Sequence, residues 1–136
     1  MKLARPRTLP GRLVTGTYIL HAGLEKWNAT QARAESVHAA ASSAYPQLAA
    51  VPPARLLKLL AGAEILTGAA LVVPLVDSRV AGVALTAFSA GLLGLYWRSP
   101  GMRRTGSIWP TPAGTAVSKD VWMLGIGLGL LAEGAR

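Results

Sequence analysis

The sequence has no cysteine among its 136 residues. Disulfides, thiol redox chemistry, and zinc or iron–sulfur sites held by cysteine are therefore excluded for this chain. Charged residues are scarce as well, at 15% of the chain, whereas soluble domains carry roughly 25%. Apolar residues make up 51%. Low charge combined with long apolar runs places the chain among integral membrane proteins.

Acidic residues are the rarer charge type, with 6 Asp and Glu against 14 Lys and Arg and a formal net charge of +8. The basic residues are scattered rather than clustered, which is unlike a nucleic-acid-binding surface. Beside apolar spans, such charges anchor helix ends and contact anionic lipids. We therefore expect a lipid bilayer around the chain and no nucleic-acid partner.

Four apolar segments predict four membrane-spanning helices, at residues 9–27, 53–76, 79–97 and 117–133. The first is a retained helix rather than a cleaved signal peptide, because charged residues separate it from the small residues downstream. The Ala-rich connection at residues 31–44 allows a short helix lying in the membrane interface. The sequence thus predicts an all-α, up-down-up-down four-helix bundle that forms a single membrane domain over residues 1–136.

Four spans place both termini on one side of the membrane and the two long connections on the other. Six of the eight aromatic residues map to the side with the connections, as an aromatic belt does. They are Trp27, Tyr45, Tyr96, Trp97, Trp109 and Trp122. Basic residues are balanced between the two sides, but the segment before the first helix is strongly basic, which favours cytoplasmic termini.

Glu64 is the most informative residue, because it lies inside an otherwise apolar segment that has only Lys58 as a second charge. A charged side chain at the centre of a membrane helix costs roughly 2.5–3.5 kcal/mol on insertion scales. Such a carboxylate is expected to face protein or water and to have a partner. A His21–Glu64 pair and a Lys26–Glu64 pair are both compatible with the helix directions, and either would lower that cost.

Other polar residues fall in the same half of the predicted bundle. His21 and Glu25 lie one turn apart on the first helix, and Lys119 and Asp120 open the last. Each also has a purely structural interpretation, such as locking helices together or anchoring a helix end. The predicted binding residues are His21, Glu25, Lys26, Glu64, Tyr96, Lys119, Asp120 and Trp122.

Small residues recur at helix-packing spacing on the last two helices. Four of them follow each other at intervals of one turn on the third helix, and Gly125 and Gly129 form a GxxxG pair on the fourth. Small residues allow the close backbone approach that drives helix association in lipid. The same pattern can also arise from the composition alone. The four are Gly82, Thr86, Ala90 and Gly94.

Three segments together resemble the DoxX-like family of small four-helix membrane proteins. They are HAGLEKW on the first helix, AGAEILTGAALVVPLV on the second and SKDVWMLGIGLGLL on the fourth. The resemblance covers roughly residues 11–132, although the Pro-rich connection at residues 98–116 is less typical. It implies the bacterial plasma membrane as the location. The positions that it singles out are Gly23, Lys26, Glu64, Gly68, Lys119 and Asp120.

The resemblance implies three kinds of function. Some family members are similar to a small subunit of a thiosulfate:quinone oxidoreductase, others to partners in complexes that handle oxidative stress or to assembly chaperones. We expect a non-catalytic subunit, scaffold or assembly factor whose partner is another membrane protein or a second copy. A quinone pocket is the alternative, with Glu64 or His21 protonating the quinone oxygen and Tyr96 or Trp122 stacking on the ring.

A redox role would need a partner chain, because two histidines do not suit a bis-His haem, and we expect neither haem nor a metal. A small transporter or proton pathway is the third possibility. Buried His and Glu are compatible with it, but the sequence shows no inverted repeat. We expect no enzymatic activity from the isolated chain.

Overall fold

The computed structural model describes residues 3–135, and its regular structure is helical. No strand occurs within these residues; a single bridge pairs Arg103 with Pro110. The all-α prediction is therefore confirmed. The α-helices are α1 Leu9–Trp27, α2 Gln31–Ala44, α3 Pro53–Val72, α4 Ser78–Arg98, α5 Thr115–Ser118 and α6 Val121–Gly134. Short 3₁₀ turns lie at Pro6–Thr8, Pro46–Ala50 and Pro112–Gly114.

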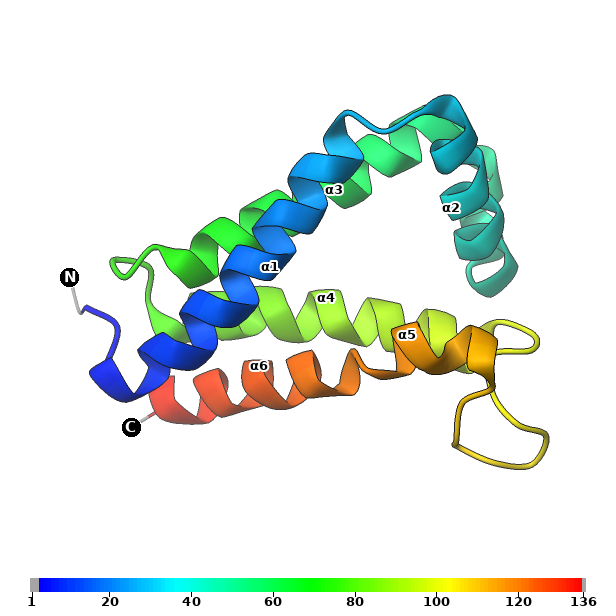
Figure 1. The fold of residues 1–136 in the computed structure, drawn as a ribbon. Helices are drawn as coiled ribbons and strands as arrows, with labels where there is room; N and C mark the ends of the chain where they lie inside the picture. The colour runs from blue at the N-terminus through cyan, green and yellow to red at the C-terminus, as the bar shows by residue number, and fades with distance from the viewer. Residues whose placement is uncertain (1–2, 136) are drawn as a thin grey trace.

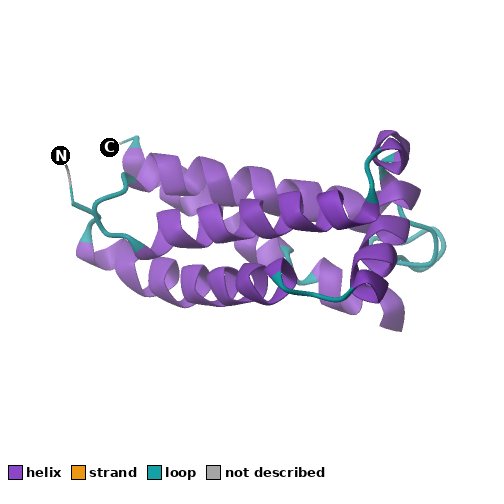
Figure 2. Ribbon diagram, turned by 90° about the horizontal axis from the view of Figure 1, so that it is seen from above, coloured by secondary structure: helices purple, strands orange, loops and turns teal. Residues whose placement is uncertain are grey.

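The four long helices alternate in direction along the chain. The start of α1, the end of α6 and the turn at residues 73–77 lie at one end of the molecule, whereas α2 and the connection at residues 99–111 lie at the other (Figure 1). Seen from above, the long helices run side by side along one common direction (Figure 2). The predicted order of the long helices and of the connections between them is therefore observed.

The long helices form two pairs, because α1 packs along α3 and α4 packs along α6. The pairs meet near the termini, and they diverge toward the opposite end, where α2 contacts both α3 and α4 (Figure 1). The shared apolar core therefore lies at the end with the termini. It consists of Ile19, Leu71, Ala81, Leu85 and Leu130.

A regular stripe of buried positions explains why α1 and α3 pair. On α1 the buried residues recur at alternating steps of four and three, which is the spacing of one helix face. They are Arg12, Gly16, Ile19 and Gly23. An added Cβ on Gly68 of α3 would lie 2.6 Å from the backbone nitrogen of Leu20. The two backbones therefore approach so closely that glycine is required at the contact.

Helix α3, the second of the predicted membrane spans, ends at Val72, earlier than the predicted residue 76. Pro74 disfavours helical geometry at the residue before it, and Val73 is extended. The Arg12 guanidinium then occupies the helix end. It is fully buried, and it donates hydrogen bonds to the carbonyls of Ala70, Leu71, Val73 and Val76 and to Ser78 Oγ at 2.9–3.2 Å.

The last helix is interrupted rather than continuous from residue 117. The short α5 ends at Ser118, Lys119 and Asp120 form the break, and α6 begins at Val121. This break places two charged side chains at the junction of the two helices.

The predicted glycine pair on α6 does not pack within the chain. A Cβ added to Gly125 or Gly129 would meet nothing within 4 Å, whereas one on Gly127 would lie 2.5 Å from Thr86 Oγ1. Gly82 and Thr86 of the predicted four-residue stripe do contact α6. Gly94 instead faces Tyr45, and Ala90 is exposed.

Two helical segments in residues 3–135 are long and apolar enough to cross a membrane. They are Ser78–Arg98, with a mean hydropathy of 1.6, and Pro112–Gly134, with 1.3. Helices α1 and α3 are not apolar enough by the same measure, because each carries three charged residues. Those of α1 are Arg12, Glu25 and Lys26, and those of α3 are Arg55, Lys58 and Glu64.

Candidate functional site

The candidate site is built around an ion pair between α1 and α3. Lys26 Nζ lies 3.0 Å from Glu64 Oε1, and the two side chains are 18% and 8% exposed. Of the two pairings that the sequence allowed for Glu64, the structure therefore forms the one with Lys26. The pair links the last turn of α1 to the middle of α3, and it compensates the buried carboxylate.

Glycine makes this pairing possible. A Cβ on Gly23 would lie 2.9 Å from Glu64 Cβ and 2.9 Å from the backbone nitrogen of Ile65. Since Lys26 follows Gly23 by about one turn, its side chain leaves α1 on the face that contacts α3. The local sequence GLEK thus supplies both the close approach and the cation.

One oxygen of Glu64 is unused. Oε2 is buried and accepts no hydrogen bond from the described residues. A buried carboxylate oxygen without a donor is unfavourable by roughly 1–3 kcal/mol or more. Lys26 is therefore the one hydrogen-bond donor to this carboxylate among the described residues.

Charges from two further elements act on this carboxylate. Arg33 of α2 lies within electrostatic range of Glu64, and Glu64 lies within electrostatic range of Asp120 at the start of α6. Lys119 precedes Asp120 and is exposed. Lys26 and Glu64 are thus paired at the α1–α3 interface, whereas Lys119 and Asp120 lie on the other helix pair, between α5 and α6.

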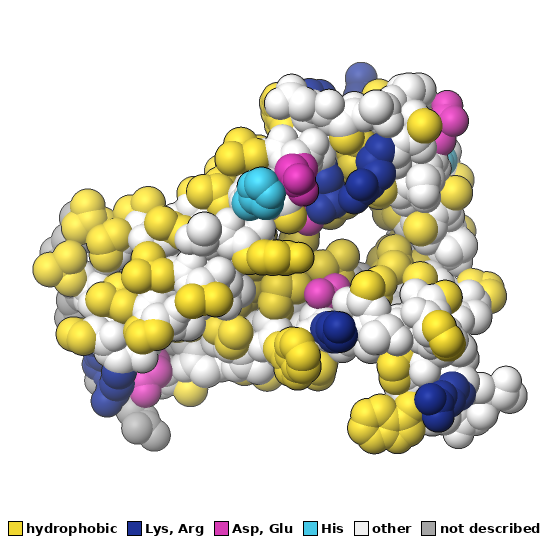
Figure 3. Space-filling model, viewed as in Figure 1, with side chains coloured by type: hydrophobic (Ala, Val, Ile, Leu, Met, Phe, Trp, Pro, Cys, Tyr) yellow, Lys and Arg dark blue, Asp and Glu magenta, His cyan; other side chains and the backbone are white. Residues whose placement is uncertain are grey.

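These charges face a hollow that we call the wedge, the space between the α1–α3 pair and the α4–α6 pair at the end away from the termini. The space-filling view shows it open, with basic side chains on the side formed by α1, α2 and α3 (Figure 3). An acidic and a basic side chain lie on the opposite side, over the start of α6 (Figure 3). The wedge thus carries both signs of charge.

His21 and Glu25 lie outside the wedge. Each side chain is 70% exposed, and His21 Nε2 lies 3.5 Å from Glu25 Oε1 one turn away. They share the outer face of α1 instead of the face that contacts α3. The structure therefore separates these two predicted site residues from Glu64.

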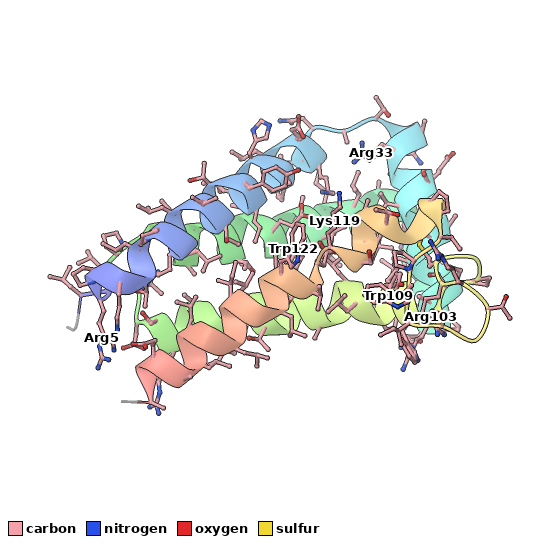
Figure 4. The ribbon with its side chains drawn as sticks, turned by 60° about the horizontal axis from the view of Figure 1, so that its bottom comes forward. Arg5, Arg33, Arg103, Trp109, Lys119 and Trp122 are labelled. Atoms are coloured by element: carbon pink, nitrogen blue, oxygen red, sulfur yellow. The ribbon has the colours of Figure 1, made fainter. Side chains whose placement is uncertain are left out.

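Tyr96 and Trp122 line a separate groove of ≈ 660 Å³ beside the wedge. Tyr96 is buried, and its hydroxyl donates to the carbonyl of Ile108 at 2.7 Å, whereas Trp122 is 69% exposed. Lys119 lies on the rim of this groove. Trp122 and Lys119 project from the α5–α6 junction, and Trp109 lies in the connection that precedes α5 (Figure 4). The other lining residues are Leu93, Trp97, Ile108, Trp109, Pro110, Ser118 and Val121.

Several contacts at the end of the molecule away from the termini were not predicted from the sequence pattern. Tyr45, after α2, donates its hydroxyl to the Gly91 carbonyl at 2.8 Å and stacks under Arg98 at 5.1 Å. Arg103 lies 3.9 Å from the centre of the Trp97 ring. The pairing of arginine and lysine with nearby aromatic residues near the helix ends is the signal that points to such contacts.

Residues 3–135 contain no cluster of three or more His, Asp or Glu side chains able to hold a metal ion. Comparisons with protein families, with curated proteins and with solved structures found no match for the chain.

Proposed function

We propose that the chain is a small DoxX-like protein of the bacterial plasma membrane that crosses the bilayer four times, with both termini in the cytoplasm. Its role is that of a non-catalytic subunit, scaffold or assembly factor of a membrane complex. The family resemblance is supported by geometry, because the positions that it singles out on the first two long helices meet at one interface. These positions are Gly23, Lys26, Glu64 and Gly68.

Membrane insertion is supported by where the apolar side chains lie. Only 28% of the most apolar stretch of α4 is buried within the chain, and only 11% of that of the segment Pro112–Gly134, which ends with α6. The core helix of a soluble protein would be mostly buried. Large apolar side chains are exposed on α1 and α3 as well, including Val14 and Leu66. Exposed apolar surface of this extent needs an apolar surrounding such as lipid.

The charges of α1 and α3 are compatible with crossing the membrane. Arg12 is completely satisfied by the end of α3, and Lys26 is paired with Glu64. Internal pairing of this kind lowers the cost of placing charges at membrane depth. Glu25, Arg55 and Lys58 lie near the helix ends, from which long side chains reach the interface.

The observation that carries the scaffold role is the open face of α6. Gly125 and Gly129 lie one turn apart and meet nothing within 4 Å, whereas Gly127 is used inside the chain. In lipid, small residues at this spacing allow another helix to approach closely. We infer that this face receives a helix of the partner, which is another membrane protein or a second copy of the chain.

The test replaces the open glycines in the full chain. Gly129→Leu and Gly125→Leu add bulk where no internal atom lies nearby, so the fold remains while partner helices are held apart. Gly11→Leu is the matched control, because it also meets nothing within 4 Å but lies on α1. The readout is the size of the complex on native gels of solubilised membranes, compared with the size formed by purified chain alone.

We expect both α6 variants to reduce the complex and the Gly11 variant to retain it. A complex that also forms from purified chain identifies a second copy as the partner. Unchanged complexes in both α6 variants would refute the role of this face.

The groove beside the wedge supports quinone binding as a second candidate, because it brings Tyr96 and Trp122 together. The expected proton donors are placed elsewhere, however. His21 is on the outer face of α1, and Glu64 is paired with Lys26. A quinone that copurifies with the chain and is lost in Trp122→Ala would favour this candidate over the scaffold role.

A further inference from the structure

We propose that the connection between α4 and α5 binds one anionic phospholipid. The phosphate of this lipid lies in a pocket lined by Arg98, Arg103 and Arg104, which we call the arginine pocket. One acyl chain lies in the groove lined by Tyr96 and Trp122, which we call the aromatic groove. This inference rests on the proposed membrane insertion, and it assigns a ligand to a part of the chain that the proposed function leaves without one.

The arginine pocket concentrates positive charge that the chain does not neutralise. It has a volume of ≈ 230 Å³, and the residues that line it besides the three arginines are uncharged. No Asp or Glu occurs in the sequence between Asp77 and Asp120. Within residues 3–135, none of the three arginines forms an ion pair with a carboxylate. Neighbouring cations without an internal counter-ion attract an anion from outside.

Two of the arginines have N–H donors that the described part of the chain does not use. Arg98 makes no side-chain hydrogen bond there, and its guanidinium lies 5.1 Å from the centre of the Tyr45 ring. Arg104 donates through Nε to the carbonyl of Pro110 at 3.2 Å, which leaves both of its terminal nitrogens. Guanidinium groups bind phosphate through pairs of parallel N–H bonds. The unused donors therefore suit a phosphate in the arginine pocket.

Internal contacts fix the shape of the arginine pocket. Arg103 donates to the carbonyls of Trp97 and Ser107 at 3.3 Å and 3.2 Å, and its guanidinium lies over the Trp97 ring. Gly101 and Gly106 line the pocket with positive φ angles of 78° and 68°, a backbone geometry that side chains disfavour. Arg103 therefore positions the connection, while Arg98 and Arg104 supply the donors. A site shaped in advance loses less conformational entropy when a ligand binds.

The aromatic groove identifies the anion as part of a lipid. Trp97 lines both the groove and the arginine pocket, so the two cavities are adjacent. The groove has a volume of ≈ 660 Å³, within the range of roughly 300–1,000 Å³ that ligand sites occupy, and its walls are mainly apolar and aromatic. Trp97 and Trp109 are 55% and 66% exposed, and tryptophan is enriched where acyl chains meet headgroups. Arg103 and Trp109 both lie at the end of the molecule away from the termini (Figure 4). A free phosphate would occupy the arginine pocket alone, whereas a phospholipid fills both cavities.

The charge around the two cavities favours an anionic headgroup over a zwitterionic one. Both types carry a phosphate, but a zwitterionic headgroup adds a cation that the arginines repel. Lys119 adds a fourth basic side chain on the rim of the groove, and Asp120 lines neither cavity. Each basic residue near the membrane surface strengthens the binding of anionic lipid by about fivefold. The site is therefore expected to prefer a headgroup with a net negative charge.

The experiment titrates the delipidated full chain in detergent and follows binding by native mass spectrometry. The probes are phosphatidylglycerol and phosphatidylcholine with identical acyl chains, and glycerophosphoglycerol, which is the first headgroup without acyl chains. We expect phosphatidylglycerol to bind at least about tenfold more tightly than phosphatidylcholine, and glycerophosphoglycerol to compete only weakly. Arg98→Gln and Arg104→Gln should each weaken phosphatidylglycerol by about fivefold. Arg55→Gln is the matched control, because it removes the same charge from an exposed position on α3 and should retain the preference.

Three results would overturn the proposal. Equal affinities for the two lipids would exclude recognition of net charge and leave the arginines to an acidic segment of a partner protein. Competition by glycerophosphoglycerol as strong as that of the lipid would show a site for free phosphate. Trp122→Ala should weaken both lipids by the same factor, so unchanged affinities would place the acyl chain outside the groove.

The variants keep this test separate from folding and from the proposed scaffold role. Arg98→Gln is informative even if Arg104→Gln disturbs the connection, because the Arg98 side chain has no internal hydrogen bond to lose among the described residues. Complex formation through Gly125 and Gly129 is measured on native gels, independently of lipid binding. A failure of either proposal can therefore be recognised without the other.

Discussion

Replacing Arg12 with methionine should strongly destabilise the chain. The guanidinium is 0% exposed and donates to four carbonyls at the end of α3 and to Ser78 Oγ. A hydrogen bond to a charged group contributes roughly 1.5–3 kcal/mol, but neighbouring bonds of one group do not add. We expect a loss of about 3–5 kcal/mol, because several carbonyls at the end of α3 lose their donor at once and each buried acceptor left without one costs roughly 1–3 kcal/mol.

Lysine at the same position separates charge from geometry. An ammonium has three donors where the guanidinium makes five contacts in a planar fork, so Arg12→Lys should recover only part of the loss. It keeps the favourable interaction of a cation with a helix C-terminus, which contributes up to about 2 kcal/mol. The order of stability should be arginine, then lysine, then methionine.

The assay is SDS titration of the full chain in mixed micelles, followed by far-UV circular dichroism. Arg55→Met is the control, because Arg55 is exposed on α3 and its loss should change the free energy of unfolding by less than about 0.5 kcal/mol. If Arg12→Met also stays within about 0.5 kcal/mol of the parent chain, the contacts at the end of α3 contribute nothing net. The account of how α1 and α3 are fixed would then be wrong.

Three further substitutions test the packing by the same titration. Gly68→Leu should destabilise by at least about 1–3 kcal/mol, since its Cβ would lie 2.6 Å from Leu20 N, while Gly62→Leu, with nothing within 4 Å, should be tolerated. Lys26→Met should cost about 3–5 kcal/mol by leaving Glu64 buried and unpaired, and adding Glu64→Gln should recover part of it. Tyr45→Phe should cost about 1 kcal/mol and speed proteolysis of α2, by losing the bond to Gly91. Equal stability of the Gly68 and Gly62 variants would contradict the first prediction. No recovery of stability in the Lys26→Met, Glu64→Gln double variant would contradict the second, and unchanged proteolysis of the Tyr45 variant the third.

The elements were predictable because their signals are local. The Ala-rich segment at residues 31–44 forms α2 with those bounds, and the long helices follow apolar runs closed by turns. The Lys26–Glu64 pair was predictable as one of two options, because helix direction alone brings both residues to the same half of the bundle. The choice between Lys26 and His21 depends on which face of α1 packs. Gly16 and Gly23 lie seven residues apart, and this spacing indicates which face of α1 packs.

The remaining features depend on contacts far apart in the sequence. Arg12 looked like one more charge in a basic leader, yet its acceptors lie 58 to 66 residues further along. On α6 the composition offers glycine at 125, 127 and 129, and only the rotation of the helix decides that Gly127 faces α4. The early end of α3 was readable from Pro74, whereas the groove and the divergence of the two pairs were not.

The absence of cysteine allows a direct test of the central claim that α1 and α3 cross the membrane together with α4 and α6. Single cysteines can be placed at exposed positions without removing any native one. Ser36 lies on α2, Thr105 in the connection before α5, and Leu75 in the turn between α3 and α4. The measurement is labelling of each variant with an impermeant maleimide, in right-side-out and in inverted membrane vesicles. Four spans predict that Ser36→Cys and Thr105→Cys react from the outside and Leu75→Cys from the cytoplasmic side. If Ser36→Cys reacts from the same side as Leu75→Cys, then α3, the one long helix between them, does not cross the membrane and the account is contradicted.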